Sequence, residues 1–113
     1  MNDALLVLST CPDKNCAEQI ARRLVGEGLA ACVNISPQIT SVYSWRGETE
    51  SAEEVLLLIK TSAGRYAQLQ QAVRSLHPYE LPEIIAVPVT QGLPEYLDWV
   101  EQCTNTETSA HSG

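Results

Sequence analysis

The chain has 113 residues, which fits one domain with a modest hydrophobic core. Hydrophobic residues make up 44% of it and phenylalanine is absent, so aliphatic side chains must fill most of that core. The 7 Lys and Arg stand against 14 Asp and Glu, and this net charge of -7 argues against binding to nucleic acid or to an anionic membrane.

The first part of the chain predicts a buried strand followed by a helix. Residues 4–10 (ALLVLST) form a nearly continuous apolar run, which is typical of a central strand buried on both faces. Over residues 13–27 the apolar side chains recur at helical spacing, and Asp13 is a good N-cap for that helix.

The next segment predicts a long β-hairpin. A second strand is expected over residues 30–35, interrupted at Pro37 by a bulge or an edge position, and resuming as far as residue 46. Residues 47–51 (GETES) indicate a polar turn, and residues 54–61 (EVLLLIKT) indicate the third strand of the chain.

A second helix and a fourth strand follow the hairpin. Ser62 can cap a helix whose apolar stripe reaches residue 76, and the proline after His77 stops it. A linker then leads to a strand expected over residues 84–89.

The C-terminal region predicts a short helix and a tail. Gly92 and Pro94 open the helix, and from residue 104 onward nothing apolar remains to bury. We therefore expect one domain over residues 1–103 and a disordered tail over residues 104–113. The order of elements predicts an α+β protein, a ferredoxin-like βαββαβ sandwich with an extra C-terminal helix.

The length of the hairpin favours an oligomer. Residues 30–46 would span about 55 Å at ~3.3 Å per residue, whereas a compact domain of this size is about 34 Å across. The hairpin must bend at Pro37, project beyond the core, or both, and its apolar residues Val42, Tyr43 and Trp45 then need cover. A second copy of the chain can supply that cover in closed symmetry, and the C-terminal helix is the alternative.

Five stretches of the sequence, in register, resemble the divalent-cation-tolerance (CutA) family. They are TCPD (10–13), LAACVN (29–34), SVYSWRG (41–47), HPYELPEI (77–84) and YLDW (96–99). The resemblance covers about residues 4–102. It implies a ferredoxin-like protomer that assembles into a tight trimer by strand pairing between subunits. It also implies a link to divalent-cation tolerance, with copper or another divalent cation as the ligand.

Cys32 and His77 are the leading candidates for a metal site. A soft thiolate suits copper(I), and a neutral imidazole can also ligate a metal. The alternatives are a buried core cysteine and a histidine that ends a helix. Ser9 and Leu76 stand where some relatives carry a cysteine and a second histidine, so the ligand set implied by the resemblance is incomplete here.

The other three cysteines carry weaker expectations. Cys11 and Cys16 are separated by four residues, which is not the Cys-x-x-Cys spacing of zinc or redox sites, although the pair could compensate for the missing metal ligands. Cys103 is expected to be incidental. We expect free thiols in a reducing compartment.

Glu80 and Glu83 flank a leucine and a proline in the linker, where two carboxylates could bind a cation. The alternative is that the prolines fix this loop for packing or for subunit contact. Four further residues are expected at a subunit interface: Tyr43, Trp45, Tyr79 and Pro88.

No catalytic motif is present, so we expect no enzymatic activity. The leading function is that of a homotrimeric metal-tolerance protein. A structural oligomer that holds partner proteins is the second possibility, and a small-molecule signalling scaffold of the PII type is the third. The chain starts with polar residues and the apolar run at 4–8 is too short for a signal peptide or a membrane span, so we expect a cytoplasmic location.

Overall fold

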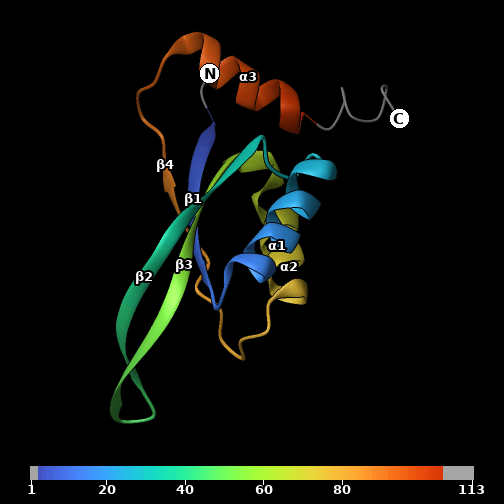
Figure 1. The fold of residues 1–113 in the computed structure, drawn as a ribbon. Coiled ribbons are helices and arrows are strands. Elements are labelled where there is room, and N and C mark those ends of the chain that lie inside the picture. Colours follow the sequence, from blue (N-terminus) through green and yellow to red (C-terminus); the bar gives the residue numbers. More distant parts are fainter. Residues whose placement is uncertain (1–2, 106–113) are drawn as a thin grey trace.

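A computed structural model describes residues 3–105 of the chain. The elements in chain order are β1 (Ala4–Cys11), α1 (Lys14–Gly26), β2 (Cys32–Trp45), β3 (Glu48–Ser62), a 3-10 turn η1 (Ala63–Arg65), α2 (Tyr66–Leu76), β4 (Ile85–Pro88) and α3 (Pro94–Thr104). Figure 1 shows α1 and α2 together on one face of the sheet, α3 across one end of it, and the β2–β3 hairpin extending from the other end.

The four strands form one antiparallel sheet in the order β2-β3-β1-β4. β1 lies inside this sheet, because it pairs with β3 from Ala4↔Ser62 to Cys11↔Val55 and with β4 on its other edge. α1 and α2 each connect two strands that are parallel but not adjacent, which is the split βαβ arrangement. The α+β ferredoxin-like fold predicted from the sequence is therefore confirmed.

The core lies between the sheet and the helices α1 and α2. Along β3 the side chains of residues 55, 57, 59 and 61 are buried, and those of residues 56, 58 and 60 are only half-buried, so the two faces of the sheet have different environments. The buried residues that fill the core most completely are Val7, Ile20, Leu24, Leu57, Ile59, Leu69 and Val73. We call the half-buried side of the sheet, which faces away from α1 and α2, the open face.

The hairpin differs from the sequence prediction in two ways. β2 runs through Pro37 as one strand, with a β-bulge between Ile35 and Gln38. The polar turn predicted over residues 47–51 is wrong, because Trp45 already pairs with Glu48 across a two-residue turn. Both turn residues, Arg46 and Gly47, have positive φ angles of 51° and 83°, as a tight hairpin turn requires.

The physical reason for the second error is that the outer half of the hairpin lies beyond the core. The strands of this outer half are exposed to solvent on both faces. Residues 48–53 therefore pair as a strand without the alternation of apolar and polar residues that marks a half-buried strand. The molecule measures 48 × 30 × 23 Å, and the hairpin both bulges and projects. Figure 1 shows α3 at the opposite end of the sheet, so the alternative in which this helix covers Tyr43 and Trp45 of the same subunit is wrong.

The helix boundaries follow local capping chemistry. The Asp13 side chain accepts a hydrogen bond of 2.8 Å from the Cys16 backbone N–H, which confirms the predicted N-cap of α1. α3 ends one residue into the predicted tail, since Thr104 is buried and its hydroxyl donates to Ser62 Oγ at 2.9 Å. Residues 106–113 of that tail lie outside the described part of the chain. None of the helices within residues 3–105 has the length and hydropathy needed to cross a bilayer.

Candidate functional site

A pocket of about 370 Å³ lies between the hairpin and the segments beside the end of β1. Three segments meet there: the end of β1, the β2–β3 hairpin (the last residues of β2 and Glu54 of β3), and the linker between α2 and β4. Its lining residues are Thr10, Tyr43, Ser44, Trp45, Glu54, Tyr79, Glu80, Leu81 and Glu83. The pocket exists because β1 stops at Cys11 while the hairpin continues, so the linker folds across the space beyond the end of β1.

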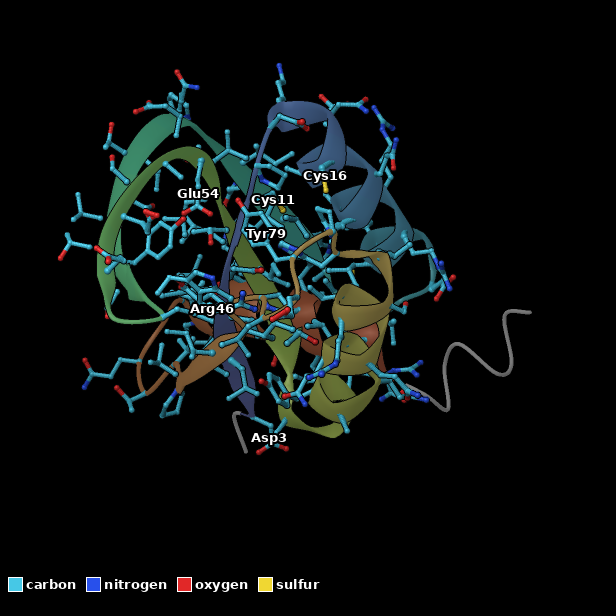
Figure 2. All side chains as sticks on the ribbon, turned by 90° about the horizontal axis from the view of Figure 1, so that it is seen from below. Asp3, Cys11, Cys16, Arg46, Glu54 and Tyr79 are labelled. Atoms are coloured by element: carbon cyan, nitrogen blue, oxygen red, sulfur yellow. The ribbon has the colours of Figure 1, made fainter. Side chains whose placement is uncertain are left out.

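Tyr79 and Glu54 form the polar floor of this pocket. The Tyr79 hydroxyl donates to Glu54 Oε2 at 2.8 Å, and the Glu54 residue is only 7% exposed. Burial, and then the neighbouring Glu54 carboxylate, raise the pKa of Tyr79 above its ordinary value of 10.0. Figure 2, seen from below, shows Glu54 and Tyr79 close together, near Cys11 at the end of β1.

His77 is buried directly behind the pocket, at the end of α2. Its Nε2 lies 2.7 Å from the Thr10 carbonyl oxygen, and because that oxygen can only accept, Nε2 carries the hydrogen. Its Nδ1 accepts a hydrogen bond of 3.2 Å from the Tyr79 backbone N–H. Both ring nitrogens are therefore occupied, and the histidine joins the end of α2 to β1.

Cys32 lies elsewhere on the sheet. It is the first residue of β2, it is half-buried, and its Sγ is 3.9 Å from Lys60 Nζ. Cys32 is paired with Lys60, whereas Thr10, which His77 contacts, is paired with Leu56. Four residue positions along β3 correspond to about 13 Å, so one subunit does not bring these two candidate ligands together.

Ser9, which stands where some relatives carry a cysteine, also lies away from Cys32. Ser9 is paired with Leu57 and faces the helices, whereas Cys32 is paired with Lys60 and faces the open side. The Ser9 hydroxyl is fully buried and has no hydrogen-bond partner within residues 3–105. Leu76 packs against the hydrophobic core.

The two linker carboxylates line the pocket without forming a metal cluster. Glu80 accepts from Arg46 Nη2 at 3.2 Å, and both side chains of this ion pair are largely exposed. In the described part of the chain, no three His, Cys, Asp or Glu side chains lie close enough together to hold a metal ion. A single subunit therefore does not fit the expected copper site.

The structure brings together Cys11 and Cys16, which the sequence suggested only as substitutes for the missing metal ligands. Cys11 ends β1 and is fully buried, and Cys16 lies in the first turn of α1. The two thiols lie close enough that each shifts the pKa of the other. The signal in the sequence is the short turn Pro12-Asp13, which folds the start of the helix back over the end of the strand.

The open face of the sheet carries an apolar surface. Six aliphatic residues from three strands form it: Leu6, Leu8, Leu56, Leu58, Ile85 and Val87. Ile85 is 52% exposed and Val87 is 47% exposed, on the edge strand β4. Pro88, an expected interface residue, is also exposed on this strand. Contiguous exposed apolar surface of this kind is typical of a contact with another protein surface.

Comparison with known proteins supports the fold and assigns the family. The sequence model of the CutA1 divalent ion tolerance protein family matches residues 5–103. A Mus musculus relative named Protein CutA is 52% identical over 104 residues, which cover 92% of this chain and 58% of the relative. The divalent-cation tolerance protein CutA of Thermus thermophilus is 48% identical over 99 residues, which cover 88% of this chain and 96% of that protein.

The chain spans little more than half the length of most of the vertebrate relatives it matches, from 54% in Homo sapiens to 65% in Danio rerio. Among solved structures, the Cut A1 divalent cation tolerance protein from Thermus thermophilus superimposes with a TM-score of 0.89 at 47% identity, over 90% of this chain and 99% of that chain. The fold, the sequence identity and the match of the family model over residues 5–103 agree, and the chain belongs to the family of CutA1 divalent ion tolerance proteins.

Proposed function

We propose that this protein serves divalent-cation tolerance as a cytoplasmic homotrimer that catalyses no reaction. In this proposal, copper or another divalent cation is held at sites to which more than one subunit contributes. The observation that carries the proposal is the apolar open face of the sheet, together with a hairpin that projects beyond its own core.

The argument for assembly rests on surface chemistry. Burying a large aliphatic side chain stabilises a protein by about 1.5–3 kcal/mol, and several such side chains on the open face are only half-buried in one subunit. The edge strands β2 and β4 border the same face. A closed symmetric assembly would cover both the open face and the edge strands β2 and β4. No edge strand would then remain free to pair with further copies of the chain.

The argument for shared cation sites rests on the positions of the candidate ligands. Cys32 is half-buried on the edge strand β2, and Glu83 is exposed on the pocket rim, so both are accessible to a neighbouring subunit. Thiolate and carboxylate ligands suit copper and harder divalent cations respectively. His77 is the weaker candidate, because both of its nitrogens already have partners.

Sedimentation equilibrium combined with calorimetry tests this proposal. We expect a mass of three subunits, and we expect Cu²⁺ or Zn²⁺ to bind in a fixed ratio to the trimer. Cys32→Ala should weaken that binding by about tenfold or more, while the matched control Cys103→Ala should leave it unchanged. A monomer, or equal binding by both variants, would contradict the proposal.

The pocket favours a second candidate function, the binding of a small organic ligand. Three aromatic residues, Tyr43, Trp45 and Tyr79, line it together with the carboxylates of Glu54 and Glu83. Aromatic rings and carboxylates together suit a small organic cation. A panel of metabolic amines that raised the melting temperature of the wild type, but not of Trp45→Ala, would support this second function over the first.

A further inference from the structure

Cys11 and Cys16 form a pair of adjacent thiols at the junction of β1 and α1. The chain leaves β1 at Cys11, turns through Pro12 and Asp13, and enters the helix at Lys14. The Asp13 cap holds the Cys16 backbone N–H at 2.8 Å, which fixes the first turn of the helix over the end of the strand. Figure 2 shows the two labelled cysteines next to each other, and Cys16 packs against the core cluster that contains Cys11.

The two thiols are not equivalent. Cys11 is fully buried, whereas Cys16 is only half-buried and can meet a dissolved reagent. Burial raises the pKa of both thiols, and the pKa of Cys11 reaches about 12. The contact between them raises the pKa of Cys11 and lowers that of Cys16. Cys16 therefore ionises before Cys11.

We propose that Cys11 and Cys16 are a reversible oxidation site, which closes to an intrachain disulfide when a peroxide reaches Cys16. The Cys16 thiolate attacks one peroxide oxygen, the O–O bond breaks, and the hydroxide that leaves takes up a proton to become water. Cys16 is then a sulfenic acid. The Cys11 sulfur attacks the Cys16 sulfur, the S–S bond forms, the S–O bond breaks, and the leaving hydroxide takes the Cys11 proton. In sum, two thiols are oxidised and one hydrogen peroxide is reduced to two waters.

The remaining cysteines are not paired in this way. Cys32 lies beside Lys60 at the start of β2, and Cys103 lies in α3, while all four cysteines are free thiols in the structure. They can therefore be removed without touching the proposed pair, which gives a direct test. The double variant Cys32→Ala/Cys103→Ala retains only Cys11 and Cys16.

The site lies next to the pocket. Thr10, the residue before Cys11, lines the pocket, and its carbonyl oxygen accepts a hydrogen bond from His77. Closing the disulfide would fix the end of β1 to the first turn of α1. Thr10, in the pocket wall, would then directly precede a covalent loop of residues 11–16.

The test uses hydrogen peroxide on the folded Cys32→Ala/Cys103→Ala protein, followed by alkylation of the remaining thiols under unfolding conditions. We expect both thiols to disappear together, with a loss of two hydrogen atoms from the mass of a single chain. Trypsin cuts after Lys14, between the two cysteines. The two flanking peptides should therefore stay joined until a dithiol reductant separates them.

Two controls make the outcome decisive. Cys16→Ala in the same background should keep its Cys11 thiol at peroxide concentrations that close the pair, because no accessible sulfur remains to start the reaction. Folding of that variant is checked by its melting curve, and Cys16→Ser provides a second version of the same control. The proposal is overturned if both thiols survive the peroxide, if Cys16 ends as sulfinic acid without a crosslink, or if the disulfide joins different chains.

Discussion

The hydroxyl of Tyr79 donates a hydrogen bond of 2.8 Å to the nearly buried carboxylate of Glu54, which lies 25 residues earlier in the hairpin strand β3. This contact connects the linker after α2 to β3. It gives the pocket a fixed floor, because neither group can turn toward solvent without leaving the other without its partner.

Tyr79→Phe should lower the free energy of unfolding by about 1–3 kcal/mol, because the substitution leaves the Glu54 carboxylate without its donor in a buried position. Urea denaturation followed by tryptophan fluorescence measures the change. Tyr43→Phe is the matched control, since Tyr43 lines the same pocket and is 44% exposed. If the two variants lost equal stability, the Tyr79–Glu54 contact would not be the cause.

The stability of the protein should fall at alkaline pH. The pKa of Cys11 is raised from 9.0 to about 12 in the folded state, so above pH 9 the unfolded chain releases a proton that the folded chain keeps. The free energy of unfolding therefore decreases as pH rises, by up to about 1.4 kcal/mol per pH unit between pH 9 and 12. Cys11→Ala should flatten this decrease relative to wild type when both are unfolded in urea at pH 8, 9.5 and 10.5. Parallel curves would exclude Cys11 as the titrating group.

Ser9→Ala should stabilise the protein by about 1 kcal/mol. The Ser9 hydroxyl is fully buried without a hydrogen-bond partner in the described residues, and removing an unsatisfied buried group recovers its lost solvation. Ser36→Ala should act in the opposite direction, because the Ser36 hydroxyl accepts from the Leu56 backbone N–H at 2.8 Å inside the β-bulge. Melting temperatures of the two variants should move in opposite senses.

Val87→Lys should break the proposed trimer, since an ammonium group placed within an apolar contact loses its hydration without gaining a partner. Val25→Lys is a close control: Val25 is 45% exposed, against 47% for Val87, but it lies on α1 on the other side of the sheet. Sedimentation velocity should give a smaller species for Val87→Lys alone. A loss of assembly in both variants would mean that the effect is not specific to the open face.

The fold could be predicted from the sequence because each buried element has a regular apolar pattern. The structure contains β1 where the apolar run over residues 4–10 predicts a strand, and α1 within the helical spacing over residues 13–27. It also ends α2 shortly before Pro78, as the sequence predicts. The turn predicted over residues 47–51 was wrong from residue 48 onward, where backbone pairing forms a strand outside the core and the composition resembles a loop. Propensity is a weak guide where neither face of a strand is buried.

The candidate site could be predicted only in part, since contacts between distant residues decide what each group is free to do. His77 was predicted to end a helix, and it does, but its bond to Thr10 crosses 67 residues of sequence. Tyr79 was expected at a subunit interface, which stays a prediction; within the subunit its hydroxyl bonds the Glu54 carboxylate, 25 residues away in sequence. Cys11 and Cys16 were considered only as substitute metal ligands, because spacing rules for cysteines assume a single loop, whereas here a strand end and a helix start meet.

The bulge between Ile35 and Gln38 determines which way the outer half of β2 faces. Before it, the odd-numbered residue Ile35 pairs with Leu57 and points to the helices; beyond it, the odd-numbered Ile39 pairs with Glu54 and points the other way. One extra residue in β2 therefore exchanges the faces to which odd-numbered and even-numbered side chains point, and it places Tyr43 on the pocket side. Deleting that residue would turn Tyr43 and the other side chains of the outer half of β2 to the opposite face of the strand. The pocket would then lose its aromatic wall through a change of one residue in length.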